Sequence, residues 1–167
     1  MEERISHLIV DGRGRADVLG DAQALSQMLL DCVHISDMEV VSGPFITEIP
    51  LSSAEHSEVF KDTGGPTVMM LGMAILSTSH ISIHAWPQEQ FFSFDLFSCK
   101  PFHHRPVLEH LKKVVGAADL TIQTVNRPTI KEFNHEPETR TDGPKEDGCA
   151  HHWQPVTPEV AEIRFGQ

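Results

Sequence analysis

The sequence is poor in basic residues: 13 lysines and arginines stand against 24 aspartates and glutamates in 167 residues, which gives a formal net charge of −11 at pH 7. Nucleic acids and anionic membranes present phosphate groups, and these attract basic protein surfaces. We therefore expect neither of them as a partner. Small polar or cationic ligands remain compatible with this charge.

Cysteines and long apolar runs are also scarce. Cys32, Cys99 and Cys149 are widely spaced and odd in number, which favours free thiols in a reducing compartment over a disulfide framework. The longest uncharged apolar run, residues 68–76, is far too short to cross a bilayer. The first residues, MEERISH, lack the basic-then-apolar layout of a secretory signal. We therefore expect a cytoplasmic protein.

Hydrophobic residues recur with strand and helix periods over much of the chain. The expected elements are, in order, a strand over 4–10 closed by a turn over 11–14, a helix from 17 or 21 to 34, one bent strand or two short ones over 38–49, a loop over 51–66, strands over 68–76, 80–86 and 92–96, a helix over 106–115 and a strand over 119–125. This order favours an α+β two-layer sandwich, a mainly antiparallel sheet with two helices packed on one face. The unbroken apolar run of 68–76 indicates a central strand that is buried on both faces.

The composition changes near residue 126. Five of the eleven prolines and three of the eleven histidines lie in 127–167, together with scattered charges and little apolar periodicity. We therefore expect a core domain over 1–126 and a Pro/His-rich C-terminal loop or tail over 127–167.

Hydroxyl, imidazole and thiol groups gather in the stretch TSHISIHAWP and in the apolar run that follows it and ends at Cys99. Such groups, brought together by neighbouring strands, can perform nucleophilic or proton-transfer chemistry. In an extended strand His80 and His84 share one face, whereas Ser79 has the opposite parity. Ser79 can therefore meet His84 only if it lies at a strand start or a bend.

The motif SHxxxHxWP at 79–87, followed by DxFxC at 95–99, resembles the prokaryotic S-adenosylmethionine decarboxylases. These are pyruvoyl-dependent enzymes of polyamine (spermidine) synthesis. The similarity extends to the order of the expected strands and helices over residues 4–126, so it covers the whole core. It implies a lyase that acts on a small, amino-acid-like substrate, with S-adenosylmethionine as the leading candidate, and a homodimeric assembly.

The resemblance assigns a role to each residue of the motif. The Ser79 hydroxyl attacks the carbonyl of Thr78, and elimination and hydrolysis then release an N-terminal chain and leave a pyruvoyl group derived from Ser79. His84 matches the histidine that removes the α-proton of the serine. The pyruvoyl ketone forms a Schiff base with the substrate amine and accepts electrons as CO₂ leaves, and Cys99 matches the residue that returns a proton. No metal is expected.

Several positions differ from the family pattern. Many members have an acidic residue before the serine, where this chain has Thr78, and a second hydroxyl residue eight positions before it, where this chain has Leu71. After Trp-Pro the family places a glutamate that holds the ribose of the substrate. Here that position is Gln88, and Glu89 follows it and in a strand points to the other face. Both are candidate substrate-binding residues. A lost carboxylate acceptor would cost the ribose about 1.5–3 kcal/mol of binding free energy.

The aromatic residue that stacks on adenine in the family also lacks an obvious counterpart, and Phe60 or Phe45 is expected to take its place. Trp86 and Pro87 are expected to fix the strand end and the pocket wall, and Trp86 is also a candidate for contact with the substrate. Two alternatives therefore stay open within the family: an enzyme for another amino acid, such as arginine or ornithine, and a non-processing homologue that regulates an active copy by forming heterodimers.

A different kind of site is also considered, because histidine and cysteine together suit zinc. The candidate ligands are His103, His104, His110, His135, Cys149, His151 and His152. The CxHH segment near the C-terminus has no partner pair at zinc-finger spacing, so the decarboxylase interpretation is preferred. Of the remaining polar residues, Cys32 is expected to be a buried small hydrophobe, Asp95 to anchor neighbouring backbone or a cation, and His80 to pack or form a hydrogen bond.

Overall fold

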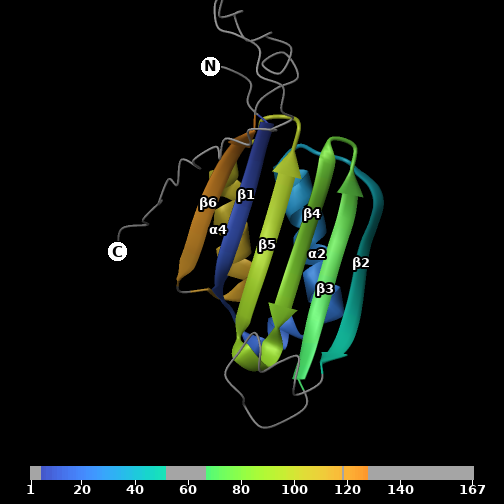
Figure 1. Cartoon of the computed structure of the whole chain (residues 1–167), viewed down its shortest axis with the longest axis vertical. Helices are drawn as coiled ribbons and strands as arrows, with labels where there is room; N and C mark the ends of the chain where they lie inside the picture. The colour runs from blue at the N-terminus through green and yellow to red at the C-terminus, as the bar shows by residue number, and fades with distance from the viewer. Residues whose placement is uncertain (1–4, 52–66, 118, 128–167) are drawn as a thin grey trace, which may run out of the picture.

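A computed structural model describes residues 5–51, 67–117 and 119–127. Its elements are β1 (Ile5–Arg13), α1 (Ala16–Leu19), α2 (Ala22–Ile35), β2 (Val40–Leu51), β3 (Thr67–Leu76), β4 (Ser79–Trp86), the 3₁₀ helix η1 (Pro87–Glu89), β5 (Phe91–Ser98), α4 (His104–Val115) and β6 (Leu120–Arg127). The described strands form one sheet in the order β2-β3-β4-β5-β1-β6, and all neighbours are antiparallel. Helices α2 and α4 both lie behind this sheet (Figure 1).

Alternate residues of each strand point to the two sides of the sheet. The side that packs against the helices holds the core, which includes Ile81 and Ile83 of β4 and Phe92 and Phe94 of β5, all fully buried. No described element covers the other side, which we call the open face (Figure 1). The open face carries His7, Ile9 and Asp11 of β1, Leu71, Met73 and Ile75 of β3, His80, Ser82 and His84 of β4, and Ser93, Asp95 and Phe97 of β5.

Strand β3 departs from the sequence prediction. The prediction placed it in the centre of the sheet and buried it on both faces, but it lies next to the edge strand β2. Its buried residues alternate with Met73 and Ile75, whose side chains are 42% and 48% exposed. The continuous apolar run therefore reflects an apolar open face and not a second covering layer.

Strand β1 is longer than predicted, because residues 11–13 continue it where a turn was expected. They pair with Phe91 of β5 and its neighbours on one side and with Leu120 of β6 and its neighbours on the other. Gly12 is required here by close packing, since a Cβ at this position would lie 2.6 Å from Leu120 Cδ2. The glycine marks a crowded strand end and not a chain reversal.

The helix boundaries follow local chemistry. The Asp21 carboxylate accepts the backbone N–H groups of Gln23 (2.8 Å) and Ala24 (3.1 Å), so the second of the two predicted helix starts is the start of α2. Cys32 is buried on α2 as predicted, and burial raises the pKa of its thiol to about 12. Helix α4 ends at Val115, as predicted, and the next residue, Gly116, caps it with φ +65°.

Gly43, with φ +97°, and shifts in the β2–β3 register confirm a single bent strand where one or two were predicted. The predicted loop lies almost wholly outside the described residues, and so does the tail after 127, so the domain boundary at 126 stays a prediction. In the described ranges, none of the helices combines the length and apolar character that spanning a bilayer requires.

Candidate active site

The turn between β3 and β4 carries the residues of the predicted cleavage site. Leu76 pairs with Ser79, so Ser77 and Thr78 form a two-residue hairpin loop and Ser79 begins β4. Ser79 is half-buried and shares the parity of the core residues of β4, with Ser98 of β5 opposite it. Its Oγ lies 3.4 Å from Nδ1 of the next residue, His80. The serine thus begins a strand directly after the hairpin loop.

The end of β5 holds Thr78 at two points. The backbone N–H of Cys99 donates to the Thr78 carbonyl oxygen at 3.0 Å, and Ser98 Oγ donates to Thr78 Oγ1 at 3.3 Å. Cys99 itself is exposed. The carbonyl that Ser79 would attack therefore already faces a hydrogen-bond donor, which would stabilise negative charge developing on that oxygen.

His84 does not join this arrangement within one chain. It is exposed on the open face, whereas Ser79 has the parity of the helix-covered face. Five residues of extended strand also separate the two by about 16 Å. Leu71 is the direct cross-strand neighbour of His84, so the position where the family pattern has a hydroxyl lies beside this imidazole.

The far end of β4 is built from aromatic rings and the 3₁₀ helix η1. The Trp86 ring centroid lies 5.7 Å from that of Phe91 and 6.1 Å from that of His84. The strand ends at Trp86, before Pro87, as predicted. Gln88 and Glu89, however, belong to η1, so the expectation that strand alternation sends them to opposite faces is wrong.

Side-chain and backbone hydrogen bonds tie η1 to its neighbours. The Gln88 Oε1 atom accepts the backbone N–H of Val68 at 3.4 Å, and Arg13 Nη1 donates to the Glu89 carbonyl at 3.2 Å. Phe60, an expected adenine-stacking residue, lies outside the described residues. The other candidate, Phe45, lies on β2 and is 56% exposed.

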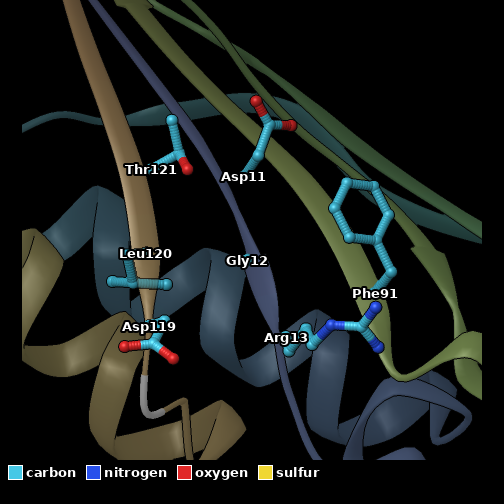
Figure 2. Close-up of a pocket in the computed structure, with 7 residues that line it drawn as sticks. All are labelled: Asp11, Gly12, Arg13, Phe91, Asp119, Leu120 and Thr121. Atoms are coloured by element: carbon cyan, nitrogen blue, oxygen red, sulfur yellow. The ribbon is translucent and has the colours of Figure 1, made fainter.

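A cavity of about 320 Å³ lies at the end of the sheet opposite to the Thr78–Ser79 turn. Its lining residues are Asp11, Gly12, Arg13, Phe91, Asp119, Leu120 and Thr121. Figure 2 shows Leu120 and Asp119 on one side of β1 and Phe91 on the other. The sequence does not predict this cavity, because residues 11–13 carry a turn signal and the strand pairing that assembles the cavity joins residues far apart in the chain.

Two open-face residues make local contacts. The Asp95 carboxylate, expected to anchor neighbouring backbone or a cation, lies 2.9 Å from His7 Nε2. The His80 ring packs against Phe97 at a centroid distance of 5.6 Å, in line with the packing role predicted for it. Neither residue faces the Thr78 carbonyl.

The histidines proposed as zinc ligands are dispersed where the structure describes them. His104 Nε2 lies 2.7 Å from Ser6 Oγ, and burial, together with the nearby His103, lowers the pKa of its imidazole. His110 Nε2 lies 3.3 Å from Asp31 Oδ2. In the described ranges no three histidine, cysteine, aspartate or glutamate residues are grouped as metal ligands would be. The remaining candidates, His135, Cys149, His151 and His152, lie outside those ranges.

Known proteins are similar to this chain in sequence and in fold. A family model described as S-adenosylmethionine decarboxylase matches residues 6–128. The chain is 29% identical over 94 residues to the S-adenosylmethionine decarboxylase proenzyme of Thermococcus kodakarensis, a match that covers 56% of this chain and 54% of that protein. It therefore spans about half the length of that relative. The proenzyme of Clostridium botulinum (strain Langeland) is 28% identical over 126 residues, which cover 74% of this chain and 94% of that protein.

The same fold occurs in a solved structure. The crystal structure of the adenosylmethionine decarboxylase from Aquifex aeolicus superposes with a TM-score of 0.56 at 16% identity, covering 83% of this chain and all of that one. The predicted α+β sandwich is thereby confirmed. Because the family model also matches well over half of the sequence, the chain belongs to the S-adenosylmethionine decarboxylase family.

Proposed function

We propose that the chain is the proenzyme of a pyruvoyl-dependent decarboxylase, which cuts itself between Thr78 and Ser79 and then decarboxylates S-adenosylmethionine for spermidine synthesis. One observation carries this proposal: the carbonyl of Thr78 accepts the Cys99 N–H at 3.0 Å, directly before the serine of the family motif. Family membership supports the reaction class. The geometry supports the first step.

In that step the Ser79 hydroxyl adds to the Thr78 carbonyl carbon, and the Cys99 N–H stabilises the oxyanion. The C–N bond then breaks, the hydroxyl proton ends on the Ser79 nitrogen, and an ester replaces the amide with no other reactant. Loss of the Ser79 α-proton next eliminates residues 1–78 as a chain with a C-terminal carboxylate. Water then releases ammonia from the remaining end and leaves a pyruvoyl group.

The residues at the turn fit such a group. Ser79 begins a strand, so the new N-terminus would stay seated by the β4–β5 pairing, beside the exposed Cys99. When present, a pyruvoyl ketone supplies the electron sink for loss of CO₂. We assign to the Cys99 thiol the return of a proton to the decarboxylated carbon.

We further propose a homodimer formed through the open face. Large apolar side chains are exposed at that side and edge of the sheet: Val41 (66%), Phe45 (56%), Ile75 (48%) and Met73 (42%). Such a patch is typical of an interface. His84 lies on the same face and away from the Ser79 of its own chain. A second copy seated there, with its His84 at the sheet end where Ser79 begins β4, would supply the histidine that takes the α-proton from the backbone of Ser79.

Denaturing mass spectrometry of the purified full-length chain tests the cleavage. The wild type is expected to give two fragments that meet between Thr78 and Ser79, with the C-terminal one reactive toward a ketone reagent. A Ser79→Ala chain is expected to stay whole. A wild type that remains full length through prolonged incubation refutes the enzyme proposal and favours the non-processing homologue.

Mixing two defective chains tests the origin of the histidine. Co-expressed Ser79→Ala and His84→Ala chains are expected to form mixed dimers in which the His84→Ala chain is cut by the histidine of its partner. Alone, the Ser79→Ala chain is expected to stay whole and the His84→Ala chain to be cut slowly. If the His84→Ala chain stays whole in the mixture while the wild type is cut, the second copy does not supply the base.

Gln88 supports an alternative assignment of the substrate. Its Oε1 atom accepts the Val68 N–H, so this side chain helps hold η1 to β3 and presents no carboxylate to a ribose. An enzyme for arginine or ornithine is therefore the second candidate. Release of labelled CO₂ from S-adenosylmethionine, arginine and ornithine in parallel separates them, and turnover of either amino acid alone would overturn the first assignment.

We also propose that the protein acts in the cytoplasm. The two described cysteines, Cys32 and Cys99, are both free thiols, which suits a reducing compartment. Fractionation of cells that express the tagged chain tests this location, and recovery in a secreted or membrane fraction would refute it.

A further inference from the structure

We propose that Ser98 is a positioning residue for self-cleavage: its hydroxyl donates a hydrogen bond to the Thr78 hydroxyl and thereby keeps the Thr78 carbonyl oriented toward the Cys99 N–H. This inference rests on the proposed function, because it concerns the peptide bond that is to be cut. We call the Ser98–Thr78 contact the hydroxyl latch.

Ser98 is unusually well buried for a residue with a polar side chain. It ends β5 on the helix-covered face and is 0% exposed, the lowest value among the buried polar residues in the described ranges. A buried hydroxyl is stable only if its hydrogen bonds are made. Ser98 Oγ accepts the backbone N–H of Lys100 at 2.9 Å and donates its one proton to Thr78 Oγ1 at 3.3 Å. The donor bond is therefore aimed at the scissile turn.

Thr78 is suited to receive this bond. Threonine is β-branched, so its side chain has few allowed rotamers. A hydrogen bond to Oγ1 therefore also restrains the Thr78 backbone. A second hydrogen bond, donated by the Cys99 N–H, is accepted by the carbonyl oxygen of the same residue. The other residue of the hairpin loop is held as well, because the Ser77 N–H donates to the Glu39 carbonyl at 3.0 Å. Within that anchored loop, the hydrogen bonds from Ser98 and Cys99 to Thr78 set the direction of the Thr78 carbonyl. This also gives a reason for Thr78 where many family members have an acid.

The latch matters for the addition step. As the Ser79 oxygen bonds to the Thr78 carbonyl carbon, the carbonyl electrons move to its oxygen, which must already face the Cys99 N–H to be stabilised. Ser98 touches neither the attacking oxygen nor the carbonyl. Its effect passes through the orientation of Thr78, and so depends on both hydroxyls being present.

The rate of cleavage of the full-length chain, followed by denaturing mass spectrometry, tests the latch. Ser98→Ala and Thr78→Val are each expected to slow cleavage about fivefold, the worth of one buried hydroxyl hydrogen bond. The doubly substituted chain should be no slower than either single variant, because both remove the same contact. Thr78→Ser keeps the hydroxyl and should cleave at close to the wild-type rate.

Two further measurements separate positioning from loss of fold. Thr67→Val removes another buried hydroxyl, one at the end of β3 opposite to the turn, and is expected to leave the rate unchanged. In an uncleavable Ser79→Ala chain, adding Ser98→Ala should speed hydrogen exchange of the Cys99 amide, because the carbonyl that accepts it is no longer held.

The outcomes distinguish this inference from the proposed function. If the wild type is cut and Ser98→Ala is cut equally fast, or if Thr78→Val is normal while Ser98→Ala is slow, the latch is wrong and the decarboxylase proposal stands. If no chain is cut, the proposed function fails, and exchange of the Cys99 amide then decides the latch. Unchanged exchange overturns it, and faster exchange supports it.

Discussion

Replacing Leu71 by serine should speed self-cleavage. Leu71 lies on the open face directly opposite His84, and the Cβ atoms of such cross-strand pairs are about 4.5–5.5 Å apart. A serine hydroxyl there can hydrogen-bond the imidazole and orient it. The family pattern has a hydroxyl residue at this position, so the substitution restores a contact that this chain lacks.

The size of the effect follows from that one contact. A hydrogen bond contributes about 0.5–1.5 kcal/mol net, which corresponds to about a twofold to tenfold faster cleavage if it acts wholly on the barrier. Leu71 is only half-buried, so its loss should lower the free energy of unfolding by about 1 kcal/mol. A domain stabilised by about 5–15 kcal/mol would remain folded.

The assay is the rate at which newly synthesised full-length chain disappears, stopped with acid and read by mass spectrometry. Ile9→Ser is the matched control, since Ile9 is half-buried on the same face but lies opposite Asp95 and Gln123. The prediction is wrong if Ile9→Ser accelerates cleavage as much as Leu71→Ser, or if the gain from Leu71→Ser persists in a His84→Ala chain.

Other predictions concern the thiols, the buried histidine and the core. In a Cys149→Ser chain, iodoacetamide should label the exposed Cys99 but not Cys32, whose pKa is raised to about 12 by burial, until the protein unfolds; labelling of native Cys32, seen by peptide mass, would contradict this. Burial lowers the pKa of His104, so the unfolded state binds the extra proton and the free energy of unfolding should fall as the pH drops below 6.5, the ordinary histidine value. Urea titrations at pH 7.5 and 5 should show a smaller fall for His104→Gln, and equal falls would exclude this residue as a cause. Gly72→Ala should lower the free energy of unfolding by about 1 kcal/mol, because its Cβ would lie 2.7 Å from the nearest side chain, and an unchanged Tm would contradict that packing.

Local patterns in the sequence predict the elements of this fold well and their environment less well. Alternation at Phe92 and Phe94, and the cap at Asp21, follow from rules that act over a few residues. Whether Met73 and Ile75 are buried depends on whether another layer packs on their side of the sheet. The apolar run in the sequence is the same with or without such a layer. Gly12 likewise signals a turn until its contact with Leu120, more than a hundred residues later, is known.

The candidate site likewise has features that local sequence predicts and features that depend on long-range pairing. Strand parity correctly separates Ser79 from His84, because it needs only their spacing. The hydrogen bonds from Ser98 and Cys99 to Thr78 need the register between β4 and β5, which a single sequence does not specify. A motif therefore points to candidate residues such as Ser79, whereas the hydrogen-bond partners of Thr78 follow only from the fold.

The strand order has a consequence for what a cut would leave behind. Cleavage after Thr78 would assign β1, β2 and β3 to one polypeptide and β4, β5 and β6 to the other. The sheet interleaves them, since β3 pairs with β4 and β1 lies between β5 and β6. The two polypeptides could part only by dismantling the central hydrogen-bonded ladders. Their separation would be as slow as global unfolding, and dilution alone would not free a fragment.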